Sequence, residues 1–167
     1  MKLVVEPLTS KNTVEAFRLI QECQEVDPFK DNRNLNVSDI DYDFSFVLRD
    51  LENGNIIGVL SGYLTTNETY KNVVSRIETT LKKDISGSFI LGGVYILPEY
   101  RNRRLSTKLL FYIERYLREE LGSILSGIYT LVNIEHSAIV TNLMSLNYSV
   151  VGVENLNSRQ FVMYKKV

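Results

Sequence analysis

One stretch of the sequence, residues 88–122, constrains the fold more than any other. It opens with SFILGGVYIL, an almost continuously apolar run that is typical of a central strand buried on both faces. A polar turn, PEYRNRR, follows this run. The stretch ends with STKLLFYIERYLREELG, which carries a broad apolar stripe at helical spacing and finishes on Gly122, a natural C-cap. A buried strand that leads through a turn into an amphipathic helix predicts an α/β sheet.

The other segments extend this sheet and cover it. Asn53-Gly54 lies between two apolar runs and indicates a hairpin, because both residues accept positive φ. Gly92 and Gly93, inside the central run, indicate a bulge or a close approach by another group. Further strands are predicted over 2–8, 44–50, 55–65, 127–134, 148–155 and 160–167, and further helices over 10–24, 67–84 and 135–147.

The composition limits the kinds of protein that could contain such a sheet. The 167 residues fit a single α/β domain over 1–167, with a mixed sheet of about seven strands flanked by helices. The net charge of −1 argues against a nucleic-acid partner. Cys23 is the only cysteine, so no disulfide can form within the chain. No apolar run approaches the roughly 20 residues that span a bilayer. We therefore expect a soluble, cytoplasmic protein with no membrane partner.

The turn before the long helix concentrates positive charge. Arg101, Arg103 and Arg104 stand immediately before the helix, and Ser106 and Thr107 add hydroxyl donors in its first turn. The first N–H groups of a helix have no partner within the helix, and the helix dipole favours an anion there. The turn therefore suits a pyrophosphate or a terminal phosphate. The alternative is a solvated basic turn in which Ser106 caps the helix.

Residues 94–110, VYILPEYRNRRLSTKLL, resemble the cofactor motif of the GNAT acetyltransferase superfamily. In that family a V-x-P pattern ends a strand and leads into R-x-x-G-x-G/A at a helix start. Here Ile96-Leu97-Pro98 matches the strand end, and RNRRLS, residues 101–106, matches the helix start. The order of elements also resembles the family over most of the chain. HSAIVTNLMSLNYSVVG, residues 136–152, resembles the family's second motif.

The resemblance implies a GNAT-like fold, splayed between the fourth and fifth strands, with acetyl-CoA as co-substrate. It also implies direct attack by a primary amine on the thioester. The main chain of the strand end would pair with the pantetheine arm, and N–H groups of the turn would face the pyrophosphate. The cofactor-binding residues implied in this way are Val94, Tyr95, Ile96, Arg101, Asn102, Arg103, Arg104, Leu105, Ser106 and Thr107.

The chain departs from the family pattern at three places. Arg104 stands where the motif has its first glycine, while Ser106, at the second, is small. Leu143 stands where the family often has a tyrosine that protonates the departing thiolate. The strand FILGGVYI lacks the carboxylate that often serves as base. Glu135 and His136 are the remaining catalytic candidates, and each also suits a helix start. The single histidine excludes a multi-histidine metal site, so no metal is expected.

These departures leave a second hypothesis open, a non-catalytic GNAT-fold module that binds a ligand or a protein. Two segments leave further alternatives. The loop with Asp27, Asp31, Asp39, Asp41 and Asp43 either attracts a cationic amine or is simply solvated. Residues 67–88 either cover the acceptor site, form a dimer contact, or pack as a surface helix. The sequence does not decide whether the chain forms a homodimer or which amine it acetylates.

Overall fold

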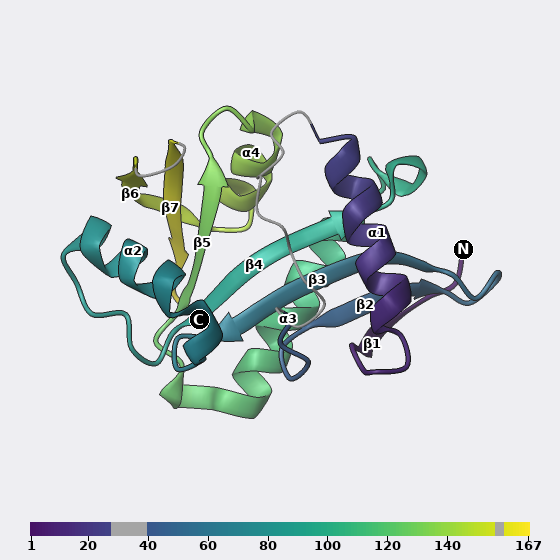
Figure 1. Cartoon of the computed structure of the whole chain (residues 1–167), viewed down its shortest axis with the longest axis horizontal. Coiled ribbons are helices and arrows are strands. Elements are labelled where there is room, and N and C mark those ends of the chain that lie inside the picture. The colour runs from purple at the N-terminus through teal and green to yellow at the C-terminus, as the bar shows by residue number, and fades with distance from the viewer. Residues whose placement is uncertain (28–39, 156–158) are drawn as a thin grey trace. The chain divides into compact units, whose positions relative to one another are not determined.

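The computed structural model describes residues 1–27, 40–155 and 159–167, and its elements follow the predicted order (Figure 1). The strands of the described part form one mixed sheet with the order β1-β2-β3-β4-β5-β7-β6. This confirms the predicted fold class. The strands are β1 (Leu3–Pro7), β2 (Phe46–Asp50), β3 (Ile56–Leu64), β4 (Phe89–Ile96), β5 (Ile128–Asn133), β6 (Ser149–Glu154) and β7 (Gln160–Lys165).

The predicted helices form as well. They are α1 (Thr13–Glu25), α2 (Lys71–Leu81), α3 (Leu105–Leu121) and α4 (Ser137–Ser145), with short 3-10 turns at Glu68–Tyr70, Pro98–Tyr100 and Gly122–Ile124. No helix in the described part of the chain is long and apolar enough to cross a membrane. The chain forms two compact units, one of residues 1–62 and 93–116, the other of residues 63–92 and 117–167. The strands β3 and β4 and the helix α3 contribute to both units.

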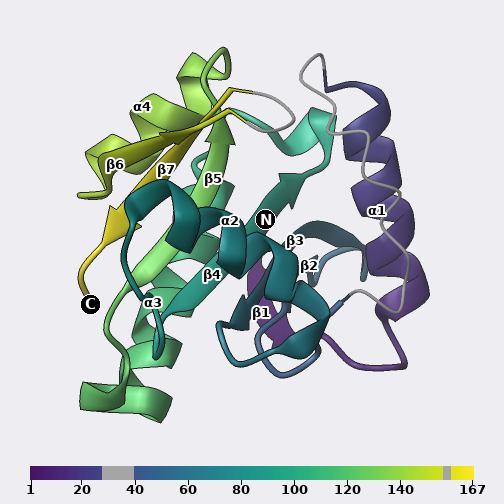
Figure 2. The same ribbon diagram turned by 60° about the vertical axis from the view of Figure 1, so that its left-hand side comes forward.

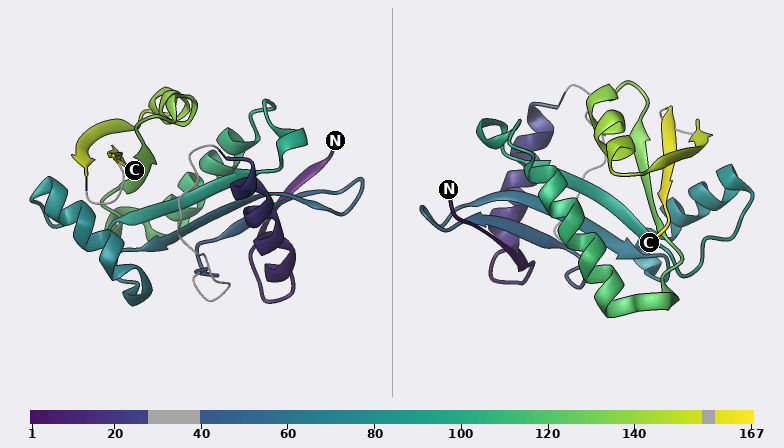
Figure 3. Two further views of the ribbon diagram at one scale, coloured as in Figure 1. Left: turned by 45° about the horizontal axis from the view of Figure 1, so that its top comes forward. Right: turned by 180° about the vertical axis from the view of Figure 1, so that it is seen from behind.

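In the first unit, helices cover both faces of the strands. The alternation of β2 explains how: successive side chains of a strand point to opposite faces. Val47 is fully buried in a cluster with Ala16 and Ile20 of α1. Phe46 points the other way and makes edge-on contacts with the rings of Tyr112 and Tyr116 in α3, at centroid distances of 5.2 and 5.0 Å. Figure 3 shows α1 and α3 on opposite sides of these strands.

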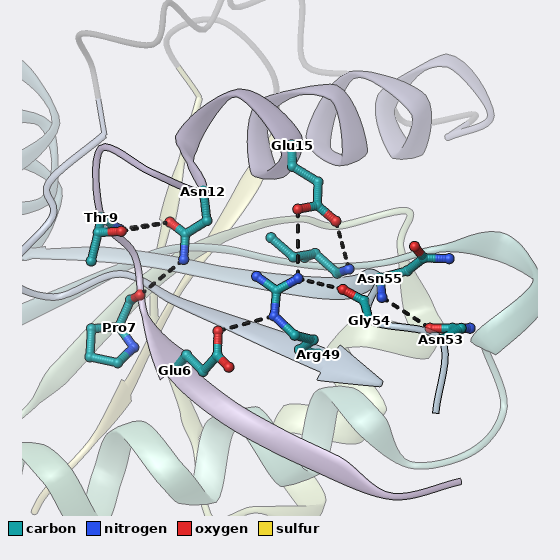
Figure 4. Close-up of polar contacts among 10 residues, drawn as sticks. Glu6, Pro7, Thr9, Asn12, Glu15, Arg49, Asn53, Gly54 and Asn55 are labelled. Atoms are coloured by element: carbon teal, nitrogen blue, oxygen red, sulfur yellow. Dashed lines mark hydrogen bonds and ion pairs between the residues drawn. The ribbon is translucent and has the colours of Figure 1, made fainter. Parts of the chain in front are cut away.

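A polar cluster around Arg49 ties β1, β2, β3 and α1 together (Figure 4). Arg49 Nε donates to Glu6 Oε2 at 3.1 Å, and Arg49 Nη1 donates to the Gly54 carbonyl at 2.5 Å. The register of β2 against β3 shifts beside Arg49, as at a bulge. The Ile56 N–H donates instead to Glu15 Oε1 of α1, at 2.9 Å. A carboxylate from the helix thus satisfies a main-chain donor of the strand.

The hairpin predicted at Asn53-Gly54 forms, but the reason given for it is only half correct. Gly54 has a positive φ of +78°, whereas Asn53 is not among the residues with positive φ. Asn53 contributes through its side chain: Oδ1 accepts the Asn55 N–H at 3.0 Å. The Gly54 N–H bonds to the Asp50 carbonyl at 2.8 Å, so the connection is longer than a two-residue turn.

In the second unit, α2 packs on β5 and β7 (Figure 2). Val74 and Ile77 of α2 are buried in a cluster with Tyr129 of β5 and Val162 of β7. The other face of these strands is covered by α4, as Figures 1 and 3 show. Within residues 67–88, Lys71–Leu81 thus form a helix packed on the sheet, and the cover for the acceptor site and the dimer contact stay hypotheses.

A buried ion pair also holds α2 on the terminal strands. Arg76 Nη2 lies 2.5 Å from Glu154 Oε2, and the Glu154 side chain is only 1% exposed. The same nitrogen donates to Gln160 Oε1 at 3.2 Å. Glu154 and Gln160 are register partners on β6 and β7, so one guanidinium contacts both strands. Removing one partner of such a pair leaves an uncompensated charge in the interior.

We predict that Glu154→Ala lowers the free energy of unfolding by about 3–5 kcal/mol, because the Arg76 charge then stays buried without its carboxylate. The matched control is Glu68→Ala. Glu68 pairs with Lys71 on the surface of the same unit, where the side chains are 84% and 72% exposed. This control should cost less than about 1 kcal/mol. Urea denaturation of both variants measures the two costs, and equal costs would contradict this account of the buried pair.

Candidate functional site

The end of β4 carries the first set of predicted cofactor-binding residues. The parallel pairing of β4 with β5 covers only residues 89–91 of β4, opposite residues 128–130 of β5. The strand β4 nevertheless continues to Ile96. This short pairing is what the predicted splay requires. Val94 and Tyr95 are half-buried, and Ile96 is buried.

Gly93 is explained by its own strand. A Cβ added at Gly93 would lie 2.7 Å from the ring of Tyr95, which is closer than real Cβ contacts come. The two residues are two apart on β4 and therefore share a face. The prediction of a close approach is confirmed, and the approaching group is the Tyr95 ring. Register shifts occur beside Leu48, between β2 and β3, and beside Val150, between β6 and β7.

The turn between β4 and α3 has an unusual main chain. Asn102 and Arg104 have positive φ, at 62° and 58°. Asparagine enters the left-handed region fairly readily, but an arginine does so at a cost of roughly 1–2 kcal/mol. The Arg104 carbonyl accepts the Lys108 N–H at 3.1 Å, so Arg104 is the N-cap residue directly before α3. The left-handed conformation therefore falls at the position where the GNAT motif has its first glycine.

The three arginines of the turn lie in different surroundings. Arg101 points back to the strand, and its Nε donates to the Ile96 carbonyl at 3.1 Å. Arg103 lies over the Tyr100 ring, with its guanidinium carbon 5.4 Å from the ring centroid, and Nη2 donates to the Glu99 carbonyl at 3.3 Å. Arg104 is exposed, and its side chain has no hydrogen bond or ion pair with any residue that the structure describes.

One neighbour of this turn was missed by sequence reasoning. Cys23 of α1 is 4% exposed, and its Sγ lies 3.3 Å from the Ile96 carbonyl that Arg101 also contacts. Burial raises the pKa of the Cys23 thiol, and the nearby Arg101 opposes that rise. No local signal in the sequence relates Cys23 to the turn, because the two lie far apart along the chain.

The two catalytic candidates occupy the start of α4. His136 is half-buried and is the residue before the helix, and its carbonyl accepts the N–H groups of Ile139 and Val140, both at 3.1 Å. Glu135 is exposed, and its N–H donates to Asn133 Oδ1 at 2.9 Å. Both residues thus take the helix-start positions that the alternative interpretation gave them.

Neither the position of the family's acid nor a metal site provides a further catalytic candidate. Leu143 is 3% exposed and belongs to the core. Tyr148 is also 3% exposed, with the Lys165 ammonium 5.6 Å from its ring centroid, so it is a core aromatic. Within residues 1–27, 40–155 and 159–167, no group of three acidic, histidine or cysteine side chains could hold a metal. Of the acidic loop, Asp31 and Asp39 lie outside the described residues.

Comparison with known proteins agrees with this arrangement. Residues 13–139 match the model of the acetyltransferase (GNAT) family. The chain therefore belongs to the GNAT acetyltransferase family, whose members use acetyl-CoA as co-substrate. No curated protein matches the chain in sequence.

Solved structures share the fold at low sequence identity. The loading GNATL domain of CurA from Lyngbya majuscula superposes with a TM-score of 0.74 at 11% identity, covering 99% of this chain and 98% of that one. Arabidopsis thaliana Naa50, in complex with the bisubstrate analogue CoA-Ac-MVNAL, gives 0.71 at 12%, with 100% of both chains covered. The ribosomal-protein-S18-alanine N-acetyltransferase from Escherichia coli gives 0.69 at 12%, covering 98% and 92%. At these identities the likeness shows the fold alone.

We predict that Arg104→Gly raises the free energy of unfolding by about 0.5–1 kcal/mol. Glycine enters the left-handed region without strain, and the entropy that glycine loses on folding offsets part of this gain. Asn102→Gly is the matched control and should change stability less, since asparagine already tolerates positive φ. Thermal unfolding of the two variants measures the difference. A loss of stability in Arg104→Gly would contradict the strained conformation at this residue.

Proposed function

We propose that the chain is an acetyl-CoA-dependent N-acetyltransferase that transfers the acetyl group to a primary amine by direct attack. The observation that carries this proposal is the main chain of the turn before α3. Asn102 and Arg104 both have positive φ, immediately before the helix start. Left-handed residues in a turn aim successive N–H groups toward one point and form an anion-binding nest. This geometry fits a pyrophosphate at the helix N-terminus.

The cofactor would supply the acetyl group as an activated thioester, and the chain's own residues would hold it. We propose that the main chain of Val94, Tyr95 and Ile96 pairs with the pantetheine arm. The N–H groups of residues 102–107 would receive the pyrophosphate. Holding two reactants in place removes much of the entropic barrier of a bimolecular reaction.

We further propose that residues 1–167 work as one domain, which the near-complete coverage by the solved structures supports. Whether the chain forms a homodimer stays open.

The proton on the acceptor amine sets the substrate class. The strand β4, FILGGVYI, has no carboxylate, and the acid position is the buried Leu143. The amine must lose its proton without the usual base, so its own pKa matters. An α-amino group, with pKa about 8, is roughly a tenth neutral at pH 7. A lysine side chain, with pKa about 10.4, is neutral in fewer than about one in a thousand molecules. A peptide α-amine is therefore the acceptor class that we propose.

A second candidate function is a GNAT-fold module that binds a ligand or protein without catalysis. Leu143 favours it, because a core leucine cannot protonate a thiolate. The two functions differ in turnover but both allow acetyl-CoA to bind. A binding measurement and a turnover measurement are therefore needed together.

We predict that titration calorimetry detects acetyl-CoA with a Kd below about 1 mM. We also predict that the chain acetylates peptides with a free α-amine faster than α-blocked peptides containing lysine. If only the neutral amine reacts and no enzyme base deprotonates it, kcat/KM should rise tenfold per pH unit up to the pKa of the amine.

The control peptide carries an acetylated N-terminus and no lysine. If acetyl-CoA gives no heat at that concentration, the proposed function is wrong. Binding without turnover on any amine would favour the non-catalytic module. A plateau in kcat/KM well below the pKa of the amine would show that an enzyme base is present.

A further inference from the structure

The carbonyl oxygen of Ile96, the last residue of β4, receives donors from two distant parts of the sequence. Arg101 Nε donates to it from the turn at 3.1 Å, and Cys23 Sγ of α1 approaches it at 3.3 Å. Cys23 and Ile96 are 73 residues apart. The carbonyl therefore joins the strand end, the turn and the first helix at one atom.

The Cys23 thiol is held as a donor at this place. Burial raises its pKa, and Arg101 is the main influence in the opposite direction. A raised pKa keeps the sulfur protonated at neutral pH, so the S–H can donate to the carbonyl. Tyr95 and Leu97, on either side of Ile96, also pack against the cluster that contains Cys23. The strand end is thus fixed by apolar packing and by two polar contacts.

The Arg101 side chain is exposed, but its guanidinium is engaged with the protein. A guanidinium that donates to a strand carbonyl beside a buried thiol is held in one geometry, since its fork has fixed donor directions. Arg103 is likewise occupied, by the Glu99 carbonyl and the Tyr100 ring. Arg104 differs from both. All three arginines are exposed, but the Arg104 side chain has no hydrogen-bond or ion-pair partner among the described residues.

We propose that Arg101 and Cys23 are positioning residues that fix the end of β4 and the following turn, and that Arg104 is the arginine whose charge meets the pyrophosphate. This inference rests on the proposed function. In this assignment Arg101 and Cys23 fix the geometry of the phosphate site, and Arg104 supplies its positive charge. The arginine that matches the family motif holds the shape, and the arginine that replaces the motif's glycine supplies the charge.

The test measures acetyl-CoA affinity by titration calorimetry over a series of salt concentrations, because salt screens a contact between two charges far more than a hydrogen bond to a neutral carbonyl. Arg104→Gln should weaken binding about tenfold at low salt, and its affinity should depend less on salt than that of the wild type. Arg101→Met should also weaken binding, but its affinity should keep the salt dependence of the wild type. Arg118→Gln, at an exposed position in the last turn of α3, is the matched control and should change neither quantity.

The Cys23 variants separate a positioning effect from simple loss of packing. Cys23→Ser keeps a donor of similar size and should retain affinity near the wild-type value, while Cys23→Ala should weaken binding in the same way as Arg101→Met. Arg101→Lys, which keeps a donor, should restore part of the affinity and serves if Arg101→Met does not fold. The assignment is overturned if an Arg101 variant reduces the salt dependence as much as Arg104→Gln does. A wild-type chain that binds no acetyl-CoA would overturn the proposed function itself.

Discussion

The carbonyl of Ile96 is the point on which the candidate site depends. A strand that stops in the interior leaves main-chain groups that need partners. Here Arg101 and Cys23 supply them, at 3.1 and 3.3 Å. Because both contacts are on the same oxygen, the end of β4 and the start of the turn are fixed together. Everything proposed for the cofactor follows from a turn held in one conformation directly before α3.

The same physical rule acts at two other places where polar groups are buried in the described residues. In the first unit, Glu15 accepts the Ile56 N–H that the bulge would otherwise leave without a partner. In the second unit, Arg76 contacts Glu154 and Gln160 on neighbouring strands. Each of these contacts joins segments that lie far apart in the sequence. Apolar packing gives the two units their cores, and these polar contacts fix which strand and helix ends meet.

Local patterns in the sequence predicted the elements, and long-range contacts escaped prediction. The apolar run of β4 and the stripe of α3 are each visible within a few residues, so both were placed correctly. The contact between Cys23 and Ile96 spans 73 residues, and no spacing rule indicates it. The roles of the arginines were equally hidden, since the pattern RNRR does not say which side chain bonds to the end of β4. The positive φ of Arg104 could be anticipated only from the glycine in the family motif.

The most direct test of the central claim is hydrogen–deuterium exchange of the whole chain with and without saturating acetyl-CoA. The account predicts slower exchange of the main-chain amides in residues 94–96 and 102–107, because the cofactor would accept hydrogen bonds from both segments. Amides near Arg76 and Glu154 in the second unit serve as the internal reference and should not change. Saturable binding with no change in residues 94–107 would contradict the account.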